Sequence, residues 1–297
     1  MKKSALILLA ILIGFSGGCA GVMTRKFPAT ENPVKMWVFA KVDENLHGFT
    51  QDWPWGTYHI PNSNVFVASV KGDEGVMAPY SFFGLLGLAF AGGNTAGDSK
   101  KQMHGLEAHL TLDTQKMTQK CLSEALAQGS GGDRFVLAGE NEESTLQIVP
   151  YMVFSFVDKE KARLWVILKT SLVDNNFNQV DWKCRYIAAL GEPRTFNGQD
   201  GWASLQPREI EAEAIRDTQE AVRAFLADLQ GKLRNEQAPR EKVNGCWVFY
   251  KRPRKVDVKF LVRGDRDDIV LPMVGDGEYF AGVNILPKDF YQAMDKK

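Results

Sequence analysis

Apolar residues recur at two different spacings along the chain, and the spacing separates predicted helices from predicted strands. Every third or fourth residue is apolar in segments 113–128 and 207–233, which predicts two amphipathic helices. Pro207 suits a first helical turn, and Gly129 suits the position just after a helix end. Alternating or β-branched runs predict strands at 34–42, 57–60, 64–70, 134–137, 145–157, 162–173 and 180–189.

The last fifty residues show a different pattern, with short strand signals and no helix. A polar stretch at 231–245 indicates a linker, and strand patterns follow at 246–250, 256–262, 268–271 and 279–283. The predicted fold class is therefore α+β: an antiparallel sheet flanked by two main helices, plus a small C-terminal β module. The predicted division of the chain is a signal peptide at 1–18, a tether at 19–33, a main α/β domain at 34–234 and the β module at 245–297.

The N-terminus has the order of a secretion signal. Lys2 and Lys3 precede an apolar run from Ala5 to Phe15, which is too short for a stable membrane span. Ser16, Gly17 and Gly18 then stop at Cys19. This arrangement resembles the lipobox of bacterial lipoproteins, although Ser16 stands where that family usually has leucine. The resemblance implies that Cys19 is acylated and becomes the new N-terminus, and that Ala20, which is not aspartate, directs the protein to the outer membrane. The alternative is a plain signal peptide with a coincidental cysteine.

Composition excludes several classes of protein. Hydrophobic residues make up 44% and charged residues 24%, which excludes a disordered chain and a polytopic membrane protein. Lys plus Arg total 36 and Asp plus Glu total 36, so no overall positive charge favours nucleic acid as a partner. The remaining cysteines, Cys121, Cys184 and Cys246, show no metal-binding spacing and are expected to be buried free thiols. The alternative is that two of them form a disulfide in an oxidising periplasm.

The order of predicted elements across residues 110–234 supplies a second resemblance. A helix, a short strand, three long antiparallel strands and a closing helix look like the auxiliary lipoproteins of ABC-type lipid transport, and the same order recurs in the curli-secretion and TolB N-terminal folds. The resemblance implies a role in transport. The Gly-rich run before the first helix and the extra C-terminal segment depart from that pattern.

An uncharged run at 77–93 is the most unusual segment of the mature chain. It contains Gly84, Gly87, Gly92 and Gly93, too many glycines for a good isolated transmembrane helix. One interpretation is a buried or interfacial loop-helix packed on the domain. The other is a segment that contacts a membrane or a partner subunit, for which the candidate residues are Phe82, Phe83, Leu85, Leu86 and Leu88.

A basic cluster marks the C-terminal part. Eight Lys or Arg and two acids lie between Pro239 and Arg263. In an exported lipoprotein the available anions are phospholipid or lipopolysaccharide phosphates, and the candidate contacts are Lys251, Arg252, Arg254 and Lys255. The alternative is a solvated face balanced by Asp265, Asp267 and Asp268.

No catalytic or cofactor motif is present in the sequence. His104 and His109 miss the spacing of a helical zinc pair, and HExxH, GxSxG and Walker-type patterns are absent. Trp53, Pro54 and Trp55 fit either a sugar-binding platform or the rim of the core. We therefore expect no catalytic residues, no metal and no cofactor.

The sequence predicts a non-enzymatic, lipid-anchored protein of the bacterial outer membrane that faces the periplasm. Its expected role is an accessory in transport or envelope assembly, acting through an envelope protein partner or a homo-oligomer and through lipid at Cys19, with no nucleic acid. The alternatives are a membrane-inserting or secretion-pore subunit that uses run 77–93, and a hydrolase acting on cell wall or lipid.

Overall fold

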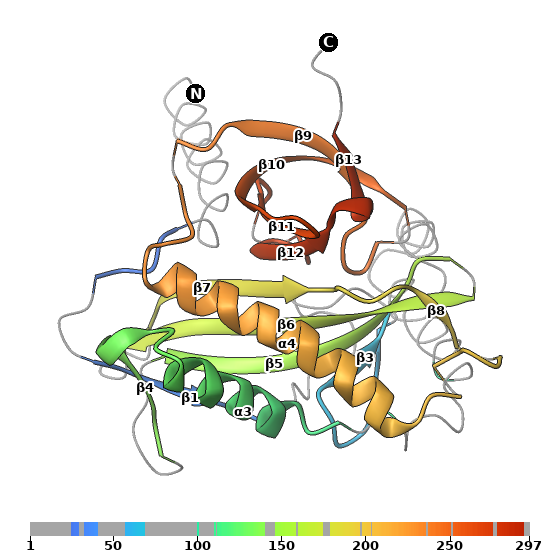
Figure 1. The fold of residues 1–297 in the computed structure, drawn as a ribbon, viewed down its shortest axis with the longest axis horizontal. Helices are drawn as coiled ribbons and strands as arrows, with labels where there is room; N and C mark the ends of the chain where they lie inside the picture. The colour runs from blue at the N-terminus through green and yellow to red at the C-terminus, as the bar shows by residue number, and fades with distance from the viewer. Residues whose placement is uncertain are drawn as a thin grey trace, which may run out of the picture.

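The computed structural model describes residues 25–29, 33–40, 57–68, 100, 110, 112–139, 146–158, 160–174, 179–196, 198–202, 204–235, 237–250, 252–275 and 278–293. These residues form one 13-stranded mixed sheet whose main path runs β13-β9-β10-β11-β12-β7-β6-β5-β1-β4 (Figure 1). Off this path, β2 pairs with β3, β3 also pairs with β5, and β8 pairs with β6. The strands are β1 Val34–Val38, β2 Tyr58–His59, β3 Val65–Val67, β4 Phe135–Leu137, β5 Leu146–Phe156, β6 Lys161–Asp174, β7 Gln179–Ala188, β8 Arg194–Thr195, β9 Arg240–Gly245, β10 Arg254–Arg263, β11 Asp267–Pro272, β12 Val283–Pro287 and β13 Tyr291–Ala293.

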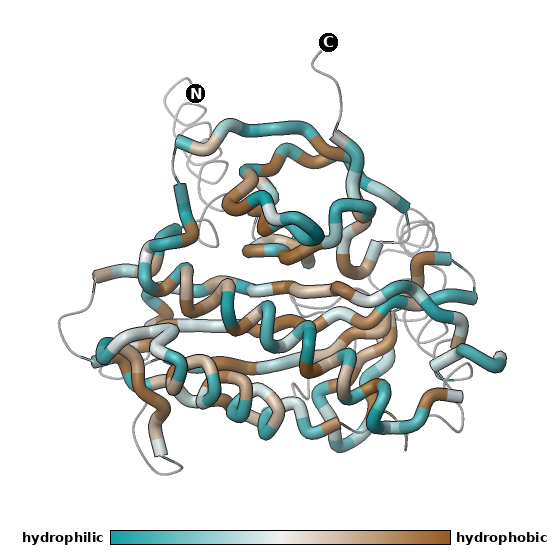
Figure 2. The backbone as a smooth tube through the Cα atoms, viewed as in Figure 1, coloured by the Kyte–Doolittle hydropathy of each residue, from teal (hydrophilic) through white to brown (hydrophobic). Residues whose placement is uncertain are grey.

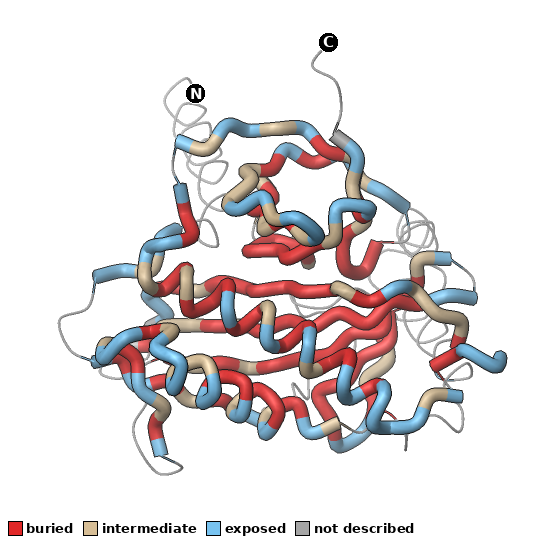
Figure 3. Tube along the Cα trace, in the orientation of Figure 1, coloured by how far each residue is buried: buried red, intermediate tan, exposed pale blue. Residues whose placement is uncertain are grey.

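The centre of the sheet is the antiparallel trio β5, β6 and β7. Leu146 pairs with Leu172 at one end of β5–β6 and Phe156 pairs with Ala162 at the other, without a break in register. Because successive side chains of a strand point to opposite faces, β6 places Leu164, Val166 and Leu168 on one face and Trp165 and Ile167 on the other. Both sets are buried, which explains why β6 lacks simple polar alternation (Figure 3).

Two helices cover one face of this trio. α3 is Thr114–Ala127, and its N-cap Asp113 accepts a hydrogen bond from Lys116 N at 2.9 Å. α4 is Pro207–Leu229 and begins with a capping box between Gln206 and Glu209. The helices pack on each other and on β5–β7, and their polar outer turns face solvent (Figure 2). Predicted helices 113–128 and 207–233 are thus confirmed to within a few residues, and Gly129 has the left-handed φ of +82° expected after a helix end.

The predicted fold class is wrong in its arrangement. Both helices lie on the same face rather than flanking the sheet (Figure 1). The sheet is mixed, because β1 runs parallel to both β4 and β5, and β12 runs parallel to β7. Strands dominate the described residues, and the C-terminal strands extend the same sheet instead of forming a separate β module. The strand order and direction depend on pairing between segments distant in the sequence, which local periodicity does not predict.

The C-terminal strands curl over the second face of the sheet and close a second core. This core joins Trp165, Ile167 and Ile187 of the central strands to Trp247 and Phe280 of the C-terminal part. The expected linker at 231–245 is wrong in its second half, because 240–245 is strand β9; the expected strand at 246–250 is a turn, in which Phe249 has a φ of +69°. The strand expected at 279–283 begins only at Val283, and those at 256–262 and 268–271 are confirmed.

Residues 25–29, which fall within the predicted tether, pack on the folded body. Trp182 Nε1 donates a hydrogen bond to Arg25 O at 3.1 Å. The Phe27 ring contacts Trp182 edge-on at a centroid distance of 5.1 Å and Phe135 at 6.0 Å, and Arg134 Nη2 donates to Pro28 O at 3.4 Å. The described part of the body therefore begins at residue 25, six positions after Cys19 in the sequence.

A buried polar network lies beneath the C-terminal end of α4. Arg234 Nε and Nη2 donate to the carboxylate of Asp228 at 2.8–3.0 Å, and Tyr186 Oη donates to Asp228 Oδ2 at 2.7 Å. Arg234 Nη2 also contacts Cys184 Sγ at 3.2 Å. Cys121, Cys184 and Cys246 are free thiols, as expected; Cys121 and Cys184 are buried, whereas Cys246 is half-buried, contrary to the expectation. Burial raises the pKa of Cys121 to about 11, so that thiol stays protonated.

Candidate functional site

Most of the candidate residues chosen from the sequence lie outside the described residues. They are Cys19, the apolar set of run 77–93 (Phe82, Phe83, Leu85, Leu86 and Leu88), Lys251, and the Trp53-Pro54-Trp55 motif. The roles of these residues therefore remain predictions.

The basic cluster is described in part, and its members have different surroundings. Arg252 and Lys255 are exposed. The Arg254 guanidinium lies 3.7 Å from the ring centroid of Tyr250 and 4.0 Å from Glu278 Oε2. Tyr250 Oη donates to the same Glu278 oxygen at 2.6 Å, so Arg254 belongs to a local ion-pair and stacking cluster.

The acids expected to balance the basic cluster have other partners. Asp268 is buried and accepts hydrogen bonds from Gly264 N and from the Tyr291 hydroxyl. Arg263 pairs with Glu241 at 2.6 Å and stacks over Phe260. Within the cluster, Arg254 is thus paired with Glu278 and Arg263 with Glu241, each one strand or turn away.

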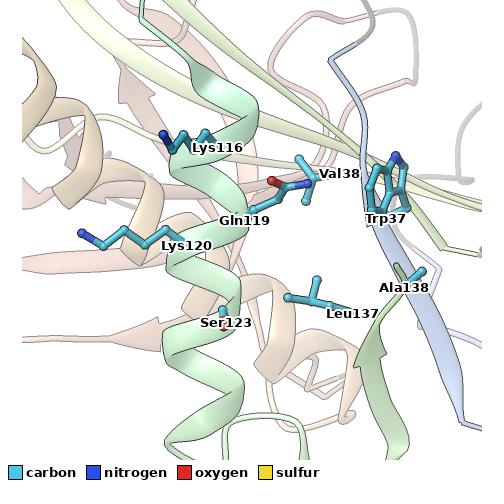
Figure 4. Close-up of a pocket in the computed structure, with 8 residues that line it drawn as sticks. All are labelled: Trp37, Val38, Lys116, Gln119, Lys120, Ser123, Leu137 and Ala138. Atoms are coloured by element: carbon cyan, nitrogen blue, oxygen red, sulfur yellow. The ribbon is translucent and has the colours of Figure 1, made fainter. Parts of the chain in front are cut away.

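A cleft of about 380 Å³ opens between α3 and the end of the sheet formed by β1 and β4. Its floor is apolar and comes from the strands, namely Val38, Leu137 and Ala138, with Trp37 at the rim. The helix contributes Lys116, Gln119, Lys120 and Ser123. In Figure 4, Gln119 and Leu137 point across the space, whereas both lysine ammonium groups point away from the strands. The cleft thus offers apolar contact with an amide and a hydroxyl at its helical side.

Local backbone geometry opens this cleft. β4 is paired with β1 only from Val34 to Met36, and Ala138 N donates the last bond to Met36 O at 2.8 Å. The next outward carbonyl, Val38 O, accepts instead from Gln115 Nε2 of α3 at 2.7 Å. The helix side chain therefore supplies a hydrogen-bond donor to β1 at the point where β4 no longer pairs with it. This cleft could not be predicted from the sequence, because it joins residues almost eighty positions apart; the sequence signal for it is the early end of each strand.

Two buried carboxyl groups of α4 face the loop after β7. Asp217 is fully buried and accepts from Leu190 N at 3.3 Å, while its Oδ2 has no partner among the described residues. Burial raises the pKa of Asp217 to about 7, against the opposing charge of Arg216 at 3.8 Å. Glu213, one turn earlier, pairs loosely with Arg194 at 3.6 Å and its pKa is also raised by burial. Neither carboxyl lines the cleft beside α3.

Within the described residues, His, Cys, Asp and Glu form no cluster of three or more that would hold a metal ion. None of the described helices combines the length and the apolar character needed to cross a membrane.

Comparison with known proteins adds little to these observations. No protein-family model matches the chain, and no curated protein matches it. Among solved structures, a Caulobacter crescentus CB15 protein described as a "putative lipoprotein" matches 40% of this chain and 82% of its own, with 14% identity and a TM-score of 0.26. Likeness at this level assigns neither fold nor function to this chain.

Proposed function

We propose that the protein is a non-enzymatic lipoprotein of the bacterial outer membrane that faces the periplasm and serves as an accessory in transport or envelope assembly. The observation that carries the proposal is the signal sequence ending in Gly17, Gly18 and Cys19, six residues before the packed segment that begins at Arg25. An acylated Cys19 would hold the folded body at the membrane, since several acyl chains make a durable anchor where one does not.

The cleft beside α3 is the part of the described body best suited to binding a partner. An apolar floor with a few polar groups at the side is typical of recognition sites, and a volume of about 380 Å³ accommodates one large side chain or a short acyl segment. The proposed ligand of the cleft is therefore an apolar group presented by another envelope component.

The anchor is tested by replacing its thiol. The Cys19→Ala variant should lose the mass of the acyl groups at its N-terminus and should leave the membrane fraction, because nothing else in the proposal holds the body there. Cys246→Ala, which removes a half-exposed thiol elsewhere, should change neither. A wild-type protein with an unmodified Cys19 thiol would contradict the proposal.

The binding role is tested by photo-cross-linking in intact envelopes. A photoreactive residue in place of Ser123 borders the cleft, and one in place of the exposed Gln219 on α4 is the control. We expect a discrete adduct from position 123 that Gln119→Trp, which fills the cleft, abolishes. Equal adducts from both positions, or an adduct that survives the filled cleft, would argue against binding there.

A further inference from the structure

The first described residues fix where the membrane anchor is attached to the body. Arg25, Phe27 and Pro28 contact Trp182, Phe135 and Arg134, at the end of the sheet where β4 and β7 begin and where α4 ends. Figure 1 shows residues 25–29, in blue, beside the start of β7 and the end of α4. A chain leaving Cys19 must therefore enter the body at this end.

The distance that the intervening chain can span is short compared with the body. Six residue steps separate Cys19 from Arg25, and even a fully extended chain covers only about 20 Å over that length. A compact chain of this size has a diameter of roughly 45–50 Å. An anchored Cys19 thus cannot bring the far side of the body to the bilayer.

The surface around Arg25 carries an excess of positive charge. We call it the N-terminal surface and define it by the charged residues next to the contacts above. The exposed or half-exposed cations are Arg25, Lys26, Arg134, Lys183 and Lys232. The exposed acids beside them are Asp133 and Asp181. Val180, 52% exposed, adds an apolar group at the start of β7.

Each cation is placed there by a contact or by its neighbour in the chain. Arg134 binds the carbonyl of Pro28 and stacks over Phe135 at 5.5 Å. Lys183 follows Trp182 on β7, so it lies at the same end of the sheet, with its side chain on the opposite face from Trp182. Lys232 lies between the end of α4 and Arg234, which contacts Cys184 on β7. The positive charge therefore lies at the end of the body that the short segment between Cys19 and Arg25 holds near the bilayer.

We propose that the N-terminal surface is the membrane-facing side of the protein and that it lies against anionic phospholipid headgroups. This inference rests on the proposed acylation of Cys19 and adds the orientation of the body and the chemistry of the surface that it meets. Clustered Lys and Arg next to an anchor are attracted to anionic lipid within about one Debye length, roughly 8 Å at physiological salt.

Two exposed valines allow a matched test of the orientation. Val180 belongs to the N-terminal surface, and Val262, 43% exposed, lies on β10 of the C-terminal part. The lipid-modified mature protein, with p-benzoylphenylalanine in place of one valine or the other, is reconstituted into vesicles of equal parts phosphatidylcholine and phosphatidylglycerol. On illumination, position 180 should capture phospholipid several-fold more than position 262. Equal capture, or more capture at 262, overturns the orientation.

Charge is tested in the same system with the probe at position 180. Capture should fall in vesicles of phosphatidylcholine alone, and should fall in the mixed vesicles with the triple variant Lys26→Glu, Lys183→Glu, Lys232→Glu. The exposed pair Arg266→Glu, Lys288→Glu of the C-terminal part is the control and should leave capture unchanged. If capture is equal in charged and uncharged vesicles, or falls with the control pair and not with the triple variant, the proposed anionic contact is wrong.

Failure of the proposed function gives a different result. The mass of the N-terminus is measured before reconstitution; a chain without acyl groups fails there and does not stay on vesicles with either probe. An acylated protein that remains on vesicles but shows the wrong capture pattern contradicts only the orientation.

Discussion

Ser155 Oγ accepts a 3.0 Å hydrogen bond from the backbone N–H of Phe249, a residue 94 positions later in the chain. Both residues are buried, and Phe249 holds a φ of +69°, a left-handed conformation that is uncommon for a large side chain. The bond ties the end of β5 to the turn that precedes β10.

Removing this acceptor should destabilise the protein. Ser155→Ala removes the oxygen that accepts this buried N–H, and losing such a bond costs about 1–3 kcal/mol of unfolding free energy. The measurement is denaturant unfolding at equilibrium. Ser123→Ala, an exposed position on α3, should stay within about 0.5 kcal/mol of wild type. Equal effects of the two variants would mean that the bond does not support the junction.

Gly282 should not tolerate a side chain. Its φ is +129°, and an added Cβ would lie 2.4 Å from the carbonyl oxygen of Arg185 on the neighbouring strand. Gly282→Ala should therefore lower the thermal midpoint markedly, with a cost of at least about 2 kcal/mol. Gly275→Ala is the control, because nothing lies within 4 Å of its added Cβ. A normal midpoint for Gly282→Ala would contradict the close approach of β12 to β7.

The buried Arg234–Asp228 pair should matter far more than a surface pair. Arg234→Met leaves the Asp228 carboxylate buried with only the Tyr186 hydroxyl, and breaking such a pair costs about 3–5 kcal/mol. Arg223→Met breaks the exposed pair with Glu220 on α4 and should cost less than about 1 kcal/mol. Adding Asp228→Asn to Arg234→Met should recover part of the loss in urea unfolding. No recovery would mean that packing, rather than charge, dominates.

Asp217 should make stability fall as pH rises. Its pKa of about 7 in the folded protein lies above the unfolded value of 3.8, so the folded state holds the proton more tightly. Its contribution to stability is fully present below about pH 4 and is lost progressively up to about pH 7. The loss of a few kcal/mol should be visible when unfolding is compared at pH 5 and pH 8.

A neutral side chain at position 217 should flatten this dependence. Asp217→Asn keeps an oxygen for Leu190 N and removes the titration. The raised pKa of Glu213 acts in the same direction and should leave a smaller residual slope. Asp181→Asn, on the surface, should leave the wild-type slope unchanged. A slope equal to wild type in Asp217→Asn would assign the effect to other groups.

Local pattern was sufficient for the elements that carry their own signals. Met117, Cys121 and Leu122 recur at helical spacing and fix the buried face of α3, and the capping residues define where both helices begin. The long strands β5, β6 and β7 were also predicted within a residue or two, because β-branched and aromatic runs leave little choice.

Pairing between distant segments could not be predicted from the local hydrophobic pattern. No local sequence signal near Val34 predicts its pairing with Phe135, and none near Val283 predicts its parallel pairing with Tyr186. The polar sequence of Arg240–Gly245 looks like a linker because β9 buries only Val243 and Gly245. The cleft beside α3 was missed for the same reason, since its floor is made by the pairing of β1 with β4.

The position of β12 beside β7 has a consequence for how the newly made chain is handled. Trp165 and Ile167 are synthesised long before Trp247 and Phe280, which shield them from water in the finished fold. Until these last strands are synthesised, the apolar second face of the central strands is exposed to water. A truncated copy ending after α4 should therefore aggregate.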